Sequence, residues 1–153
     1  DLSDNNTIEI NASNNNLGLG DYEFSLDNEF GPFQSDATFS NVSAGIHTIF
    51  VRDKRGCGTA FLEVSVIGYP KFFTPNNDGY NDHWQIKGLR SDFQPESIIY
   101  IFDRYGKLIK QLDALSNGWD GTFNGQALIT NDYWFSLFLQ DGRVVKGHFT
   151  LKR

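Results

Sequence analysis

Residues 74–82 (TPNNDGYND) are the stretch of the chain whose residue types and spacing best suit ion chemistry. Oxygen-bearing side chains occupy the first, third and fifth positions and a glycine the sixth, as in a calcium-binding loop. The last position of that template falls on Gln85 instead of glutamate, so a site built from Asn76, Asp78 and Asp82 would be weak. The alternative is a tight turn whose Asn and Asp side chains accept hydrogen bonds from their own backbone. No other cofactor is predicted.

The remaining reactive residue types form no recognisable catalytic pattern. His47, His83 and His148 lie on separate segments without metal-ligand spacing, and the sequence contains no nucleophile elbow, P-loop or dinucleotide-binding glycine pattern. The single cysteine, Cys57, excludes an internal disulfide and a Cys-rich zinc site; it is expected to be a half-buried thiol or to pair outside this chain. A pair of carboxylates meeting in space is not excluded. We predict that the protein is not an enzyme.

Composition narrows the classes of partner. Of 153 residues, 39% are hydrophobic and 21% charged, which is typical of a folded globular protein. No apolar run approaches the ~20 residues of a transmembrane helix, so we expect a protein that does not span the membrane. The net charge of −6 argues against nucleic-acid binding, which needs clustered cations. Because the sequence lacks an initiator Met and a signal peptide, we expect it to be cut from a longer precursor.

Hydrophobic and polar residues alternate with period two through most of the chain, which predicts strands and no amphipathic helix. The clearest element is the last hairpin, where Asp141 and Gly142 favour a two-residue type I′ turn. His47 and His148 are expected at strand surfaces, and Leu62 is expected on the inward face of the strand 59–66. The expected strands are 7–12, 22–26, 46–52 and 59–66 in the first part of the chain, and 97–102, 107–112, 133–140 and 143–153 in the second.

Charge and aromatic content both change between the two parts of the chain. Residues 1–67 carry 10 Asp and Glu against 3 Lys and Arg, with 7 aromatic residues; residues 68–153 carry 9 against 10, with 16 aromatic residues. Gly68 and Pro70 interrupt the strand ladders, and so we predict one domain at 1–67 and another at 69–153. Short strands and Asn-, Gly- and Ser-rich turns predict two small antiparallel Ig-like β-sandwiches in tandem. Most aromatic rings of the second domain are expected in its core; a binding platform would require several outside it.

The second domain resembles a known family through four ordered motifs, which cover residues 69–153. These motifs are 73–82 (FTPNNDGYND), 101–107 (IFDRYGK), 118–125 (GWDGTFNG) and the closing pair 132–135 (DYWF) and 146–153 (KGHFTLKR). They are similar to the gliding-motility-associated C-terminal domain, the type B sorting domain of the type IX secretion system. The first domain resembles the Ig-like repeats of adhesins from the same system at 22–27 (YEFSLD), 44–48 (AGIHT) and 51–57 (VRDKRGC).

The resemblance implies that residues 69–153 are a folded secretion signal. It implies recognition by outer-membrane components of the type IX machinery, including a porin-like partner protein. The chain would then be the C-terminal region of a gliding or adhesion protein, exported through the periplasm and outer membrane and attached to the cell surface. The alternative is that the two domains form a ligand- or glycan-binding adhesin module.

The last expected strand is the natural candidate for docking. Lys146, His148 and Lys152 fall on its outward face, and the strand ends at Arg153. A sheet edge with cations offers both backbone hydrogen bonds and charge to a partner, so we predict that these four residues dock the secretion machinery. An ordinary solvated edge is the alternative.

Overall fold

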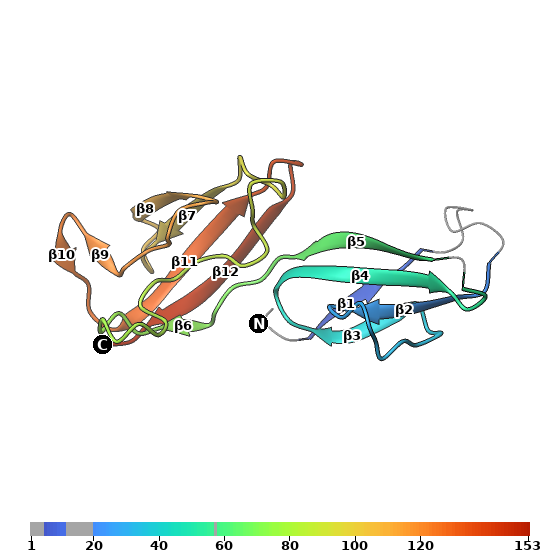
Figure 1. Ribbon diagram of the computed structural model, residues 1–153. Helices are drawn as coiled ribbons and strands as arrows, with labels where there is room; N and C mark the ends of the chain where they lie inside the picture. Colours follow the sequence, from blue (N-terminus) through green and yellow to red (C-terminus); the bar gives the residue numbers. More distant parts are fainter. Residues whose placement is uncertain (1–4, 12–19, 57) are drawn as a thin grey trace. The chain divides into compact units, whose positions relative to one another are not determined.

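The chain forms strands, turns and loops throughout the parts that the computed structural model describes, which are residues 5–11, 20–56 and 58–153. In these residues no helix is long and apolar enough to cross a membrane. The predicted all-β class is therefore confirmed. The strands group into two compact units, Leu2–Val66 and Ile67–Arg153 (Figure 1).

The first unit contains two small antiparallel sheets. One pairs β1 with β3, and the other has the order β2-β4-β5. Its core includes the buried side chains of Phe24, Val42 and Ile49. The strands are β1 (Asn6–Glu9), β2 (Tyr22–Leu26), β3 (Thr38–Val42), β4 (Gly45–Asp53) and β5 (Thr59–Val66).

Two side chains of the first unit differ from their expected placement. His47, expected at a strand surface, is only 8% exposed, and its ring nitrogens lie 2.7 Å from Asp27 Oδ2 and 2.9 Å from the Ser43 carbonyl oxygen. Conversely, Leu62 belongs to the face of β5 expected to be inward, yet it is 65% exposed. The alternating pattern locates the face of a strand, but a second sheet must cover that face before its side chains are buried.

The second unit is organised around one five-stranded sheet with the order β6-β12-β11-β7-β8. The β6–β12 pair is parallel and the other pairs are antiparallel. A short β9–β10 hairpin lies outside this sheet (Figure 1). The strands are β6 (Phe72–Phe73), β7 (Ile98–Phe102), β8 (Leu108–Asp113), β9 (Thr122–Phe123), β10 (Gln126–Ala127), β11 (Asn131–Phe138) and β12 (Val144–Leu151).

Aromatic side chains fill the core on the inner face of this sheet. Trp84 and Trp119 come from the long connections 74–97 and 114–121, and their backbones pair with each other through two hydrogen bonds of 2.9 Å. The Trp84 ring stacks on Phe149 of β12 at 3.9 Å between centroids, and both are fully buried. The layer facing the sheet thus consists mainly of irregular chain anchored by tryptophan. For that reason the Ig-like sandwich stays a prediction.

Two aromatic side chains lie close to the backbone in the middle of β12, which explains the glycine there. A Cβ atom at Gly147 would lie 2.6 Å from the Tyr69 hydroxyl oxygen and 2.7 Å from Cε1 of Phe135. The two rings also contact each other edge-on, with centroids 4.6 Å apart. Tyr69, which the sequence places at the domain junction, is therefore a core residue of the second unit.

The final hairpin forms where expected, but its turn is different. Gly142 has a φ of 88°, whereas a type I′ turn also needs a positive φ at Asp141, which does not have one. Instead the Gly142 N–H donates to the Leu139 carbonyl and the Leu139 N–H to the Arg143 carbonyl. This is a three-residue loop, a turn followed by a left-handed glycine. Asp141 stabilises it by accepting from the Arg143 N–H at 3.0 Å.

Candidate docking surface and candidate metal loop

Strand β12 carries two of the four candidate docking residues, Lys146 and His148, while Lys152 and Arg153 follow its last residue, Leu151. It pairs with β11 along its whole length, from Val144 opposite Phe138 to Leu151 opposite Asn131. Residues with odd numbers face the core, and those with even numbers lie on the opposite side, which we call the outer face of the sheet. Lys146 and His148 are exposed on this outer face, as predicted from the alternation. Docking of a partner by these two residues stays a prediction.

The basic stripe, which we define as Lys146, His148 and Lys152, is bordered by exposed aromatic rings. The Trp134 ring lies 6.3 Å from that of His148, and Lys152 Nζ lies 4.1 Å from the centroid of the Phe72 ring. These rings were not predicted to lie at the surface. The signal was available, because Trp134 and Phe138 alternate with the core residues of β11. Exposed fractions on the outer face are 44% for Phe72, 41% for Trp134, 45% for Phe138, 47% for Val144 and 46% for Leu108.

Arg153 has a different environment from the other three candidates. Its backbone N–H donates to Oγ1 of Thr130 at 2.8 Å. Its guanidinium donates to four backbone carbonyl oxygens, those of Leu128 at 2.9 Å, Pro75 at 3.2 Å, Gly121 at 3.3 Å and Asp120 at 3.4 Å. The side chain therefore joins the end of β12 to three connections of its own unit, and the structure does not bring it into the basic stripe.

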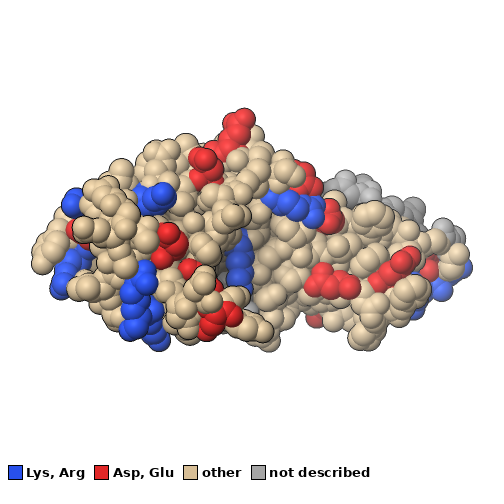
Figure 2. Space-filling view, turned by 60° about the vertical axis from the view of Figure 1, so that its left-hand side comes forward, with Lys and Arg blue, Asp and Glu red and all other residues tan. Residues whose placement is uncertain are grey.

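The charge difference between the two units is visible on the surface. Ten of the 13 Lys and Arg residues belong to residues 68–153. Most of those visible in Figure 2 lie over the C-terminal unit. Some are paired within their own turns: Arg143 bonds Asp141 at 2.7 Å and Arg90 bonds Asp92 at 2.6 Å.

The candidate calcium loop is held by hydrogen bonds among its own residues. Both carboxylate oxygens of Asp82 accept backbone N–H groups, Oδ1 from Asn77 at 2.6 Å and Oδ2 from Gly79 at 2.8 Å. Asn76 and Asp78 are bonded to each other, through Nδ2 to Oδ2 at 2.7 Å and through the Asp78 N–H to Asn76 Oδ1 at 3.1 Å. These are the bonds that the turn interpretation predicts.

The three candidate metal ligands thus share one loop, but their oxygens are engaged with donors. Desolvation acts to raise the pKa of Asp82, and the N–H donors of Gly79 and Asn77 outweigh it, so the pKa lies below its ordinary value. In the described residues, this loop included, no group of three or more His, Cys, Asp and Glu side chains is placed to hold a metal ion. Calcium binding by Asn76, Asp78 and Asp82 stays a prediction. Cys57 lies outside the described residues.

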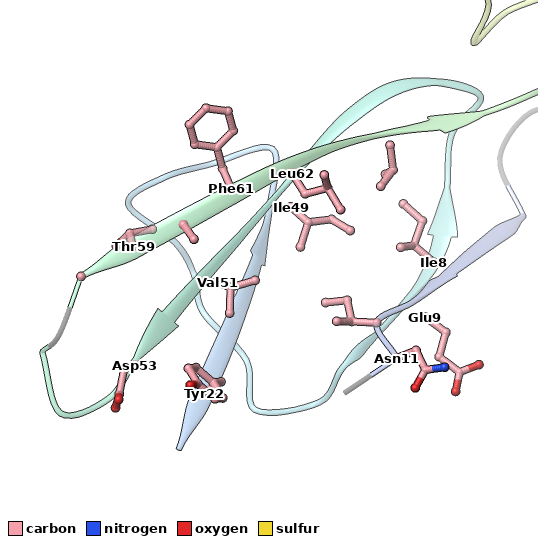
Figure 3. Close-up of a pocket in the computed structure, with 14 residues that line it drawn as sticks. Ile8, Glu9, Asn11, Tyr22, Ile49, Val51, Asp53, Thr59, Phe61 and Leu62 are labelled. Carbon is pink, nitrogen blue, oxygen red and sulfur yellow. The ribbon is translucent and has the colours of Figure 1, made fainter. Parts of the chain in front are cut away.

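A cavity that the sequence did not indicate lies in the first unit. It has a volume of about 720 Å³ and opens between β1 and the β2-β4-β5 sheet. In Figure 3 the side chains of Ile49 and Leu62 point into it from β4 and β5, while Ile8 faces them from β1. Glu9 and Asp53 line its polar margin, whereas Phe61 points away. Its floor is apolar, which suits an apolar ligand group.

Comparison with known proteins gives one family. The family model described as "CHU_C Type IX secretion signal domain" matches residues 67–151. No curated protein matches the sequence significantly. Among solved structures, the BSP domain of a biofilm-associated protein is similar at 15% identity and a TM-score of 0.36, over 88% of this chain and 25% of that one. Dimeric latent PorU from Porphyromonas gingivalis is similar at 16% identity and a TM-score of 0.36, over 99% of this chain and 17% of that one. The chain thus spans a quarter or less of these structures, and such scores add nothing to the fold assignment.

Proposed function

The chain belongs to the CHU_C type IX secretion signal domain family, and on this premise we propose that its second unit carries a passenger to the cell surface. One observation carries the proposal. The family match covers residues 67–151, and the compact unit that contains it begins at Ile67 and ends at Arg153. A signal that is a folded unit with its own core is suited to recognition by shape and surface chemistry.

The machinery that reads this signal lies at the outer membrane. We propose that its components, including a porin-like partner protein, bind the basic stripe of Lys146, His148 and Lys152 together with the rings beside it. Exposed aromatic rings are enriched in protein interfaces, and the lysines beside them offer charge complementarity to a partner. The bonds of Arg153 to its own unit support a structural contribution from that residue.

The passenger is proposed to be a gliding or adhesion protein, and the chain to have no enzymatic activity of its own. The first unit would be an Ig-like adhesin-type repeat and the second a type B sorting domain, with the boundary between residues 67 and 69. Nucleic acid is not an expected partner, since the net charge is −6. Surface attachment would follow export.

A truncation in the native host tests the export function. A chain that ends at Val66 lacks the proposed signal, so we expect the passenger to accumulate in the periplasm and to disappear from the surface. Protease accessibility on intact cells, with antibody detection in periplasmic fractions, measures both pools. The matched control restores residues 67–153 and should return the passenger to the surface. Surface display of the truncated chain would refute the proposal.

The cavity of the first unit favours a second candidate function. An adhesin module needs a site, and the cavity beside Ile8, Ile49 and Leu62 is open and apolar, with polar groups at its margin. We propose glycan or small-ligand binding there as the alternative. Binding of the purified chain to a glycan array, abolished by Leu62→Asp, would support it; equal binding by both proteins would contradict it.

A further inference from the structure

Three hydrogen bonds establish to which side of β12 each backbone N–H and C=O group points. The N–H groups of Thr150 and Lys152 donate to the carbonyls of Lys71 and Phe73, at 2.8 and 3.0 Å, and so point toward β6. At the other end, the Arg143 carbonyl accepts from Leu139 and so points toward β11. Because backbone groups alternate sides along a strand, the N–H and C=O groups of Lys146 and His148 point away from β11, toward the side of β6.

Strand β6 covers only the end of this edge. It begins at Phe72 and pairs with Thr150 and Leu151 alone. The chain before it turns inward instead of following β12: the Pro70 carbonyl accepts from Trp84 Nε1 at 2.9 Å, and Gly68 pairs with Lys87. Among the described strands, none lies beside residues 144–148 on that side.

The part of the β12 edge that β6 leaves uncovered, residues 144–148, carries exposed cationic side chains. Its residues are Val144 to His148, with Lys146 and His148 exposed on the outer face and Lys152 farther along. Their register with β11 runs without a bulge. A regular edge is a template for an added strand, and lysine on it disfavours any strand that brings a further positive charge. A second copy of β12 would place its own Lys146 nearby, so self-pairing is disfavoured as well.

We propose that an extended, acidic segment of the outer-membrane sorting machinery adds to the sheet as a strand beside residues 144–148, in line with β6. Its backbone bonds the N–H and C=O groups of Lys146 and His148, and its carboxylates face the basic stripe. This inference rests on the proposed export function. It deepens that function by assigning the mode of docking and the charge of the docking segment.

The opposite edge of the sheet is a poorer template. Strand β8 pairs only with β7 among the described strands, but its register with β7 shifts opposite Ile101 and Phe102, at a bulge or similar irregularity. Bulges twist an edge away from further pairing. The Ala114 N–H donates to the Ser97 carbonyl, so by alternation the N–H of Gln111 points outward from this edge. Gln111 therefore offers a matched control position.

Proline substitution in the full-length protein tests the strand addition. Proline at position 146 removes an N–H that points away from β11, so the β11–β12 hydrogen bonds remain. We expect Lys146→Pro to melt close to the parent and to reduce surface display about tenfold or more, because it leaves an acceptor of the added strand unsatisfied and obstructs the edge. Lys146→Ala keeps the N–H and should have a smaller effect. Gln111→Pro, the same change on the other edge, should leave display unchanged.

Two further variants keep the test decisive. Val145→Pro removes an N–H that faces β11 and should unfold the domain, which verifies the assigned backbone direction. Lys146→Glu leaves the backbone intact and repels an acidic strand, so it should reduce display in a folded protein. If Lys146→Pro unfolds, the result with Lys146→Glu decides.

Normal display by folded Lys146→Pro, or by Lys146→Glu, would overturn the proposal. An equal loss with Gln111→Pro would also overturn it, since the effect would then not belong to β12. A parent that is dimeric by size-exclusion chromatography and becomes monomeric with Lys146→Pro would identify a second copy as the occupant and reject the acidic partner segment. Display of the chain that ends at Val66 would instead refute the export function itself.

Discussion

Arg153 is expected to stabilise the second unit, and Arg153→Ala tests this. The guanidinium joins the end of β12 to the carbonyls of Leu128, Pro75 and two residues of the 118–125 segment. Only the Nε bond to Leu128, at 2.9 Å, has the usual length of an N–H···O bond; the others are 3.2 to 3.4 Å. Counting one charge-assisted bond and discounting it for exposure gives a loss of about 1–2 kcal/mol.

That loss corresponds to a fall in melting temperature of about 4–16 °C for a unit of this size. Thermal denaturation followed by circular dichroism and by tryptophan fluorescence measures it, since Trp84 and Trp119 report on the core of this unit. Lys152→Ala is the matched control, because the ammonium of Lys152, the residue next to Arg153, lies against the exposed Phe72 ring. Arg153→Lys keeps the charge but lacks the planar guanidinium, so its melting temperature should lie between those of Arg153→Ala and the parent. Equal melting of Arg153→Ala and the parent would refute the structural role.

Three further results are expected. Phe149→Ala removes a fully buried ring stacked on Trp84, so the free energy of unfolding should fall by about 3–5 kcal/mol in urea titrations; a loss below about 1 kcal/mol would contradict the packing. Hydrogen bonds from Arg143 lower the pKa of Asp141 to about 2; this carboxylate therefore stabilises the fold above its ordinary pKa of 3.8, and the contribution is lost as the pH falls toward 2. Asp141→Asn should show less loss of stability between pH 5 and pH 2 than the parent, as measured by melting temperature. If the 74–82 loop binds calcium with a dissociation constant of ~1 mM, calcium at ~5 mM should stabilise the protein by about 1 kcal/mol relative to a chelator. Identical melting temperatures in calcium and in chelator would contradict calcium binding and favour the turn interpretation.

Local alternation was sufficient to predict most of the strands. The expected strand 59–66 is the observed β5, and the strand expected at 143–153 contains β12, with its outward lysines where predicted. The observed β1 ends at Glu9, whereas the expected strand ran to residue 12, which lies outside the described residues. Turn type was less accessible, because an Asp-Gly pair fits both a type I′ turn and a left-handed glycine after a different turn.

Burial and hydrogen bonding across the fold were not predictable from local pattern. Leu62 lies on the predicted inward face, but it lines the cavity between β1 and the β2-β4-β5 sheet and is largely exposed. Arg153 is predicted to dock because it ends a basic strand, and that pattern gives no sign of its hydrogen bonds to loops up to 78 residues away in the sequence. Fewer aromatic rings of the second unit are buried than expected, and those on the outer face border the candidate docking residues.

The central claim is that residues 67–153 are sufficient to direct export. The most direct measurement fuses them to a reporter that is otherwise confined to the periplasm of a type IX-competent host, and quantifies the reporter on intact cells with a surface-accessible protease. We predict surface exposure of the fusion in the parent host and periplasmic retention in a strain that lacks the type IX translocon. A fusion that stays in the periplasm of the parent while the domain is folded would contradict the account.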